Sequence, residues 1–208
     1  MQLPSIPTAL FTSSLCAFAL GTSSCVSNPS DPPQVAWASQ VTMPDVAVAQ
    51  APFEQVEVKW KERFREPYVY IENRGDYRNV GYRIADLMQI AADQAIPVAG
   101  APFVLFFDDP GKTVQEELYA RICLGINDEF MARPPLLVDE LRQELVVYAA
   151  IGGAYSEVPR AYPRLIERIY QLNGMITGPI RESYLVSPVG ALTESLVTEV
   201  QIPWGPQP

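Results

Sequence analysis

VYIENRGDY, residues 69–77, returns 78 positions later as VYAAIGGAY, residues 147–155. The correspondence continues without a gap, so that residues 69–118 match residues 147–196. Two copies of one unit predict a fold with pseudo-two-fold symmetry. Positions at which the two copies differ in chemistry are therefore the first candidates for a functional site. The matched residues of the first copy are Val69, Tyr70, Gly75, Tyr77, Val80, Leu87, Gly100, Pro110, Glu116 and Leu118.

Hydrophobic periodicity predicts the same elements in both copies. Alternating apolar and charged residues indicate strands, and an apolar stripe of helical spacing predicts a helix that begins after the turn at Asp76. The first unit is expected to hold strands at 56–64 and 68–71, a helix at 77–95, and strands at 103–107 and 117–126. The second is expected to hold a strand at 141–150, a helix at 155–172, and strands at 180–186 and 195–202.

This element order predicts an α+β fold of two duplicated strand-helix-strand-strand units, with an extra leading strand in the first. The units are expected to form one curved antiparallel sheet with two helices. Neither unit alone can cover its sheet and its helix, so pairing them should bury one continuous core and leave a cleft along the pseudo-dyad.

Composition excludes several classes of function. The 208 residues carry a net charge of −9 and no basic run, which argues against nucleic acid as a partner. The absence of histidine excludes histidine-based catalytic triads and histidine-ligated metal or haem sites. The spacing of the three cysteines does not suit a metal site, and Cys123 fits a small buried hydrophobe in an apolar strand. We therefore expect no metal and no cofactor.

The N-terminal region has the features of an export signal. Residues 8–21 are apolar or small, and Thr22-Ser-Ser-Cys25 resembles a lipoprotein cleavage box. Residues 1–25 are therefore expected to be a signal segment with Cys25 as the lipidated residue, although no Lys or Arg precedes Lys59. The alternative is an N-terminus that is not a signal. Residues 26–52 are expected to be a disordered tether, and the protein to be periplasmic or anchored to the membrane only by this lipid.

One pair of aligned positions breaks the chemistry of the repeat. Glu182 aligns with Val104, and strand alternation places it on one face with Ile180 and Tyr184, whereas Arg181 points to the other face. An ionised carboxylate in apolar surroundings is costly unless it is paired or takes up a proton. Glu182 is therefore a site candidate; the alternatives are a solvated face or a structural bond to a tyrosine.

Four short motifs resemble the GyrI-like small-molecule-binding domain, the effector-binding module of multidrug-responsive regulators. They are Gly75-Asp-Tyr77, residues 104–110 followed by 116–118, Gly153-Ala-Tyr155, and Arg181-Glu-Ser-Tyr-Leu185. The resemblance covers residues 53–204, with repeats at about 56–127 and 140–204. It implies a pocket between the two units that Glu182 faces, two residues before Tyr184, and it places Phe106 where the family often has tyrosine.

The leading hypothesis is a stand-alone binding domain for a hydrophobic or cationic small molecule. A carboxylate within an aromatic cage suits cations through charge pairing and cation–π attraction. An alternative is a GyrI-like hydrolase, for cyclopropanoid or other xenobiotic compounds, with Glu182 as general base and Tyr184 orienting the substrate. A second alternative is a protein-interaction module. The expected ligand-binding residues are Glu182, Tyr184, Tyr155, Tyr77, Trp60 and Phe106.

Overall fold

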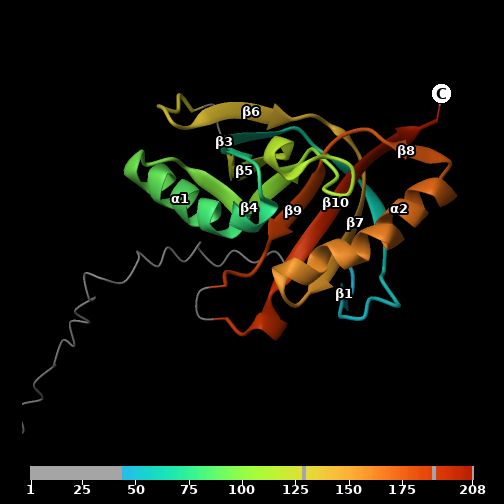
Figure 1. Ribbon diagram of the computed structural model, residues 1–208. Helices are drawn as coiled ribbons and strands as arrows, with labels where there is room; N and C mark the ends of the chain where they lie inside the picture. The colour runs from blue at the N-terminus through green and yellow to red at the C-terminus, as the bar shows by residue number, and fades with distance from the viewer. Residues whose placement is uncertain (1–43, 128–129, 189–190, 208) are drawn as a thin grey trace, which may run out of the picture. The chain divides into compact units, whose positions relative to one another are not determined.

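A computed structural model describes residues 44–127, 130–188 and 191–207, all of which belong to the unit Pro33–Pro208. The predicted signal segment with Cys25, and the predicted tether up to residue 43, lie outside the described residues. The described chain forms one ten-stranded sheet with two helices on one of its faces (Figure 1). The α+β class is therefore confirmed.

The main path of the sheet runs β1-β7-β10-β9-β4-β5-β3-β6, while β2 pairs with β7 and β8 with β10. The strands are β1 (Val48–Ala49), β2 (Lys59–Arg63), β3 (Glu66–Arg74), β4 (Val98–Phe106), β5 (Tyr119–Ile126), β6 (Leu137–Leu141), β7 (Glu144–Gly152), β8 (Gly174–Ile176), β9 (Ile180–Tyr184) and β10 (Val197–Pro206). All strand pairs are antiparallel except β1 with β7. The expectation of a purely antiparallel sheet is corrected by this one parallel pair.

Both units contain a leading strand, which corrects the prediction of one in the first unit alone. β6 lies 78 residues after β2, and β7 lies 78 residues after β3. The leading strands are exchanged between the units, because β2 pairs with β7 and β6 pairs with β3. The prediction missed β6 because four of its five residues are exposed, so it lacks the alternation of a half-buried strand.

Each helix begins with a 3-10 turn that follows a glycine with positive φ. In the first unit, η1 (Tyr77–Asn79) leads into α1 (Val80–Asp93), and the Asp76 carboxylate accepts the bond from the Arg78 N–H. In the second, η3 (Tyr155–Ala161) leads into α2 (Tyr162–Gln171). Gly75 at φ 87° and Gly153 at φ 100° make the preceding turns, where a side chain would be strained.

The core under the helices consists of two separate clusters, which corrects the prediction of one continuous core. One cluster packs under α1 and is built on its stripe from Val80 to Ala91; the other packs under α2 around Leu165 and Ile169. Cys123 is fully buried on the opposite face of the sheet, as predicted. The space between the two clusters lies at the pseudo-dyad.

The end of the predicted tether is part of the fold. β1 extends the sheet beside β7, and Val46, Ala49 and Phe53 are buried. The sequence did not predict this because residues 44–53 have no regular period. Ala49 and Phe53 pack into the cluster under α2, whereas Val46 packs in a separate cluster with Tyr148 and Ala150. Across the described residues, no helix is long and apolar enough to cross a membrane.

Candidate functional site

The aligned pair that differs in chemistry, Val104 and Glu182, lies on the pseudo-dyad itself. β4 and β9 pair antiparallel, and in this register Val104 stands directly opposite Glu182. These two residues are 78 positions apart, so the equivalent positions of the two units meet at the centre of the sheet. A side chain here lies between the two helices and can be reached from both units.

Glu182 is a buried carboxyl that accepts two hydrogen bonds from tyrosines. Its side chain is 3% exposed. The Tyr162 hydroxyl donates to Oε1 at 2.5 Å, and the Tyr184 hydroxyl donates to Oε2 at 2.9 Å. Burial raises the pKa of Glu182 to about 7, although the two tyrosine hydrogen bonds oppose the shift. Burial also raises the pKa values of Tyr162 and Tyr184 well above their usual range, so both hydroxyls keep their protons.

Arg181 does not neutralise this carboxyl. Its side chain lies on the opposite face, where it makes two hydrogen bonds to Glu66 at 2.6 and 3.0 Å. Its guanidinium also stacks 3.9 Å from the ring centroid of Phe103. Among the described residues, no Lys or Arg forms an ion pair with Glu182.

Every member of this hydrogen-bonded trio differs from its counterpart in the first unit. Tyr162 replaces Ile84, Glu182 replaces Val104 and Tyr184 replaces Phe106. The three counterparts in the first unit are apolar and pack around α1. The repeat therefore pairs an apolar half-site with a polar one across the pseudo-dyad.

A symmetric pair of tyrosines borders the trio. Tyr77 packs against Phe106 with ring centroids 4.9 Å apart, and Tyr155 packs against Tyr184 at 4.6 Å. Their hydroxyls bond to backbone: Tyr155 donates to the Val186 carbonyl at 2.8 Å, and Tyr77 donates to the Tyr119 carbonyl at 2.9 Å. These bonds fix both rings in place beside the trio.

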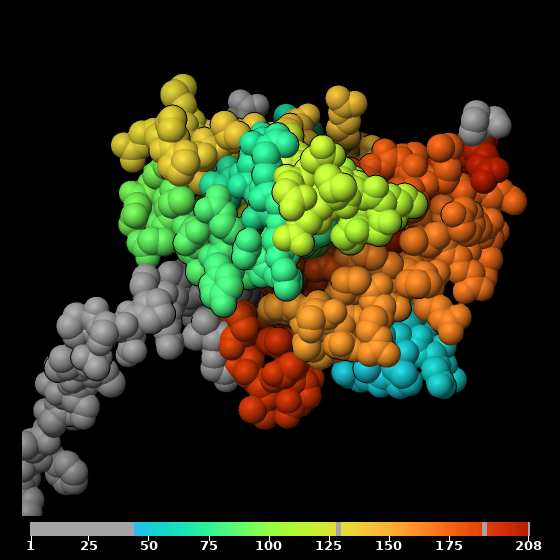
Figure 2. Space-filling model, in the orientation of Figure 1, coloured from blue at the N-terminus to red at the C-terminus, as the bar shows by residue number. Residues whose placement is uncertain are grey.

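The trio forms part of the wall of a cavity of about 1150 Å³. This is slightly above the range of about 300–1,000 Å³ that is typical of small-molecule sites. Figure 2 shows the hollow between the yellow-green segment that follows β4 and the orange α2, with residues of the C-terminal part at its base. Five of the six predicted ligand-binding residues line it: Glu182, Tyr184, Tyr155, Tyr77 and Phe106.

The sixth predicted residue, Trp60, does not line the cavity. It lies on β2, at the edge of the sheet, and is 53% exposed. The cavity instead lies over β4 and β9 at the centre of the sheet. Trp60 therefore has to be removed from the candidate site.

Tyr162 is the functional candidate that the sequence-based prediction omitted. It occupies the helix stripe, where an aromatic residue is usually explained by core packing. Its difference from Ile84 in the repeat was the available signal. The residue becomes distinctive only when its hydroxyl is placed against Glu182.

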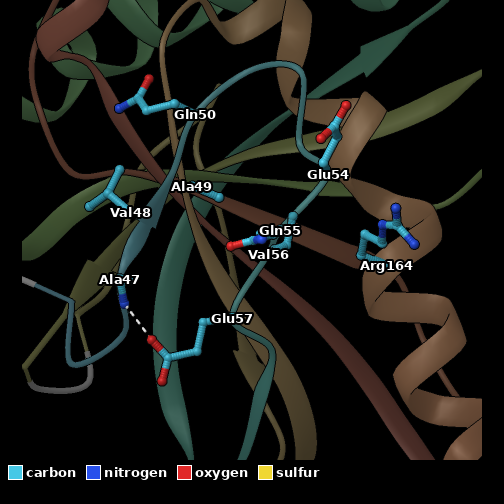
Figure 3. Close-up of a pocket in the computed structure, with 9 residues that line it drawn as sticks. All are labelled: Ala47, Val48, Ala49, Gln50, Glu54, Gln55, Val56, Glu57 and Arg164. Atoms are coloured by element: carbon cyan, nitrogen blue, oxygen red, sulfur yellow. Dashed lines mark hydrogen bonds between the residues drawn. The ribbon is translucent and has the colours of Figure 1, made fainter.

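A second hollow of about 760 Å³ lies between the N-terminal segment and α2 (Figure 3). Two of its charged side chains already have partners: Glu57 accepts a bond from the Ala47 N–H at 2.8 Å, and Arg164 pairs with Glu167 at 3.5 Å. No buried carboxyl is among the residues that line it. The cavity at the pseudo-dyad is therefore the stronger candidate.

No metal site is evident in the described part of the chain, where no three His, Cys, Asp or Glu side chains cluster closely enough to hold an ion. Asp108 and Asp109 instead stabilise a turn. The Asp108 carboxylate accepts from the Tyr119 N–H, and the Asp109 carboxylate accepts from the Gly111 N–H, both at 2.8 Å.

Solved structures with this fold include EcmrR and a protein described as a hydrolase. The EcmrR C-terminal domain matches with a TM-score of 0.62 and 18% identity, over 73% of this chain and 99% of that one. EcmrR in a DNA complex matches with a TM-score of 0.63 and 18% identity, over 73% of this chain but only 58% of that one. A hydrolase from Listeria innocua matches with a TM-score of 0.54 and 10% identity, over 72% of this chain and 92% of that one. At these identities the likeness concerns the fold alone.

Comparison with curated proteins found no match. The model of the GyrI-like small molecule binding domain, by contrast, matches residues 54–204, which include the repeat, the trio and the cavity. The chain belongs to the GyrI-like family of small-molecule-binding domains.

Proposed function

We propose that this protein binds a hydrophobic cation in the cavity at the pseudo-dyad, with Glu182 as the counter-charge. One observation carries the proposal: a buried carboxyl faces a largely apolar cavity with two tyrosine hydroxyls as its hydrogen-bond donors. Without a ligand, burial favours the protonated form of Glu182. A cation within reach of Oε1 or Oε2 restores the charge balance and favours the ionised form.

The surrounding rings fit the same ligand class. The rings of Tyr77, Phe106, Tyr155 and Tyr184 all border the cavity. Aromatic faces attract cations, most strongly where water is excluded. A flat or bulky organic cation can therefore gain apolar burial, ring contacts and a charge pair together.

Calorimetric titration with a matched pair of probes tests this proposal. The cation 1-methylquinolinium and the neutral 1-methylnaphthalene have nearly the same shape, so the difference between their affinities reports on charge. At pH 8, Glu182→Gln should weaken binding of the cation about tenfold or more, because loss of the charge pair is expected to cost about 1.4 kcal/mol or more. The neutral probe should change by no more than about twofold.

Glu54→Gln is the matched control, because Glu54 borders the second hollow instead. It should leave both affinities unchanged. Equal losses of affinity for both probes in Glu182→Gln would contradict charge pairing. A loss of cation affinity in Glu54→Gln would show that the cation binds in the second hollow instead.

A hydrolase is the second candidate. The raised pKa of Glu182, about 7, matches the requirement for a general base at neutral pH. A protein with the same fold is described as a hydrolase, although that likeness concerns the fold alone. A screen of esters, epoxides and strained-ring compounds should then show turnover that Glu182→Gln abolishes; a screen without turnover supports binding only.

We further propose that the protein is exported and anchored by a lipid on Cys25. The support is the sequence of the leader and the small residues that precede Cys25. Mass spectrometry of the protein from a bacterial membrane fraction tests this. An acylated N-terminal Cys25 is expected, and an intact Met1 would contradict export by this route.

A further inference from the structure

Beyond the pseudo-dyad, the cavity extends along α2 of the second unit but not along α1 of the first. Beyond the symmetric centre, it is lined by Pro163, Ile166 and Tyr170 of α2, Ile176 of β8, and Phe107 and Pro110 of the facing loop. We call the part of the cavity that these six residues line the arm. None of their counterparts 78 positions away, Ala85, Met88, Ala92, Val98, Leu185 and Pro188, lines the cavity.

The helices explain this asymmetry. α2 borders the cavity along its whole length, whereas α1 borders it only near its beginning, with Val80, Gly81 and Ile84. The next position of the α1 stripe, Met88, is buried in the core cluster under that helix. Its counterpart Ile166 borders the cavity instead, so the arm is open only on the side of α2.

The arm leads away from the carboxyl. Tyr162, which donates to Glu182, stands at the first turn of α2, and Tyr170 stands eight residues later. At 1.5 Å per residue this is about 12 Å along the helix axis. A ligand with its charge at Glu182 therefore needs an elongated body to reach the far end.

The chemistry of the arm suits an apolar body. Its six residues are all apolar apart from the hydroxyl of Tyr170, but the ring of Phe107 is already packed against Tyr119, with ring centroids 5.0 Å apart. At its rim, Lys112 pairs with Asp109 at 3.0 Å, and the Asp108 carboxylate accepts a hydrogen bond from the Tyr119 N–H. These charged side chains therefore already have partners within the protein.

We propose that the arm is a subsite for the apolar tail of an elongated amphipathic cation whose charged head pairs with Glu182. The placement of the charged head at Glu182 rests on the proposed function. The placement of the tail along α2 is the new inference. Two residues should decide how long a tail the protein prefers: Ile176 in the floor and Tyr170 at the far end.

A chain-length series tests the arm separately from the head. The probes are 1-methyl-, 1-butyl- and 1-octylquinolinium below their aggregation concentrations, titrated by calorimetry at pH 8. Full burial corresponds to about a fourfold gain in affinity per methylene, and a partly open arm to about twofold. The octyl probe should therefore bind about 100-fold more tightly than the methyl probe.

Ile176→Ser should reduce the ratio of octyl to methyl affinity about fivefold or more. It should change the affinity of the methyl probe by no more than about twofold. Tyr170→Ala should reduce it in the same direction. Val98→Ser is the matched control, because Val98 is the counterpart of Ile176 and is similarly exposed, 37% against 39%. It should leave the ratio unchanged, which excludes general adsorption of the chain.

The outcomes separate the two proposals. If the methyl probe does not bind to the unaltered protein, the proposed head site is wrong. The other outcome is that the methyl probe binds while the ratio of octyl to methyl affinity is the same in Ile176→Ser and Val98→Ser. In that case the proposed head site stands, and the proposed tail subsite is contradicted. A thermal unfolding curve for each variant shows whether it is folded at the temperature of the titration.

Discussion

At the scale of single residues, the polar trio distinguishes the second unit of the repeat from the first and makes it the candidate site. The first unit keeps Ile84, Val104 and Phe106 in its core, and the second places hydroxyl, carboxyl and hydroxyl groups at the equivalent positions. Each group alone would leave a buried polar atom without a partner, which is costly. Together they satisfy one another and leave one titratable proton in the cavity.

That proton predicts a specific pH dependence of stability. The pKa of Glu182 is about 7 in the folded protein, against an ordinary value of 4.5. The folded state therefore binds more protons than the unfolded state between these values, so this carboxyl lowers the free energy of unfolding as the pH rises from 4.5 to 7. The loss should be about 3 kcal/mol and complete above pH 7.

Urea unfolding from pH 4.5 to 8 measures this effect in the unaltered protein and in Glu182→Gln. Subtracting the free energy of unfolding of Glu182→Gln from that of the unaltered protein removes the contribution of the other carboxyls. This difference should fall as the pH rises and become constant above pH 7. The exposed Glu116 supplies the control, since Glu116→Gln should leave the pH profile unchanged. A difference that does not vary with pH would mean that Glu182 keeps its ordinary pKa.

The sequence predicted most of the residues of this candidate site because the repeat acts as an internal comparison. Glu182 and Tyr184 stood out from their counterparts, and Tyr77 and Tyr155 matched each other. Trp60 was misplaced because its distance from the cavity depends on which strand forms the edge of the sheet. Strand order follows from long-range pairing, which local periodicity does not encode.

At the scale of elements, the exchange of the leading strands has a chemical explanation. Two residues connect β2 to β3, and two connect β6 to β7. Two-residue hairpins favour Asn and Gly, but these connections are Phe64-Arg65 and Arg142-Gln143. Each leading strand therefore continues past its own unit and pairs with the other one.

The charges of the exchanged strands support this pairing. Lys61 on β2 pairs with Glu199 of the second unit at 3.0 Å, and Asp139 on β6 pairs with Arg121 of the first at 2.6 Å. In the repeat, Lys61 corresponds to Asp139 and Arg121 to Glu199, so the same contact is made twice with the signs reversed. Pairing within a unit would bring Lys61 to Arg121 and Asp139 to Glu199, which is repulsive.

We therefore predict that Lys61→Glu lowers the free energy of unfolding by about 1–2 kcal/mol, since it replaces an attraction with a repulsion at a partly exposed site. Adding Glu199→Lys should restore most of this loss, because the pair is then reversed. Chemical denaturation of the two single variants and the double variant gives the coupling energy.

Lys112→Glu is the control for this cycle, because Lys112 also pairs at 3.0 Å but within an exposed loop. It should cost no more than about 0.5 kcal/mol. A double variant that is no more stable than Lys61→Glu alone would show that the charges do not contribute to the pairing of the strands.

At the scale of the whole molecule, the N-terminal segment belongs to the binding domain. The family match begins at residue 54, but Ala49 and Phe53 complete the core under α2, and Val46 packs in a separate cluster on β7. The Asp45 carboxylate accepts bonds from the Tyr148 hydroxyl at 2.9 and 3.0 Å, and β1 pairs with β7. Phe53, 3% exposed, packs in the same cluster as Leu165 and Ile169.

A chain that begins at residue 54 should therefore be much less stable than one that begins at residue 44, because it exposes the apolar surface beside α2. Phe53→Ala alone should lower the free energy of unfolding by about 3–5 kcal/mol, the range for removing a buried aromatic side chain. Phe64→Ala makes the same chemical change at a side chain that is 72% exposed, so it should cost no more than about 0.5 kcal/mol. Urea unfolding midpoints of the four proteins measure these differences. Equal stability of the two truncated chains would show that the domain ends where the family match begins. If the chain that begins at residue 44 is the more stable one, as expected, the domain includes the segment that packs behind α2, the helix that lines the cavity.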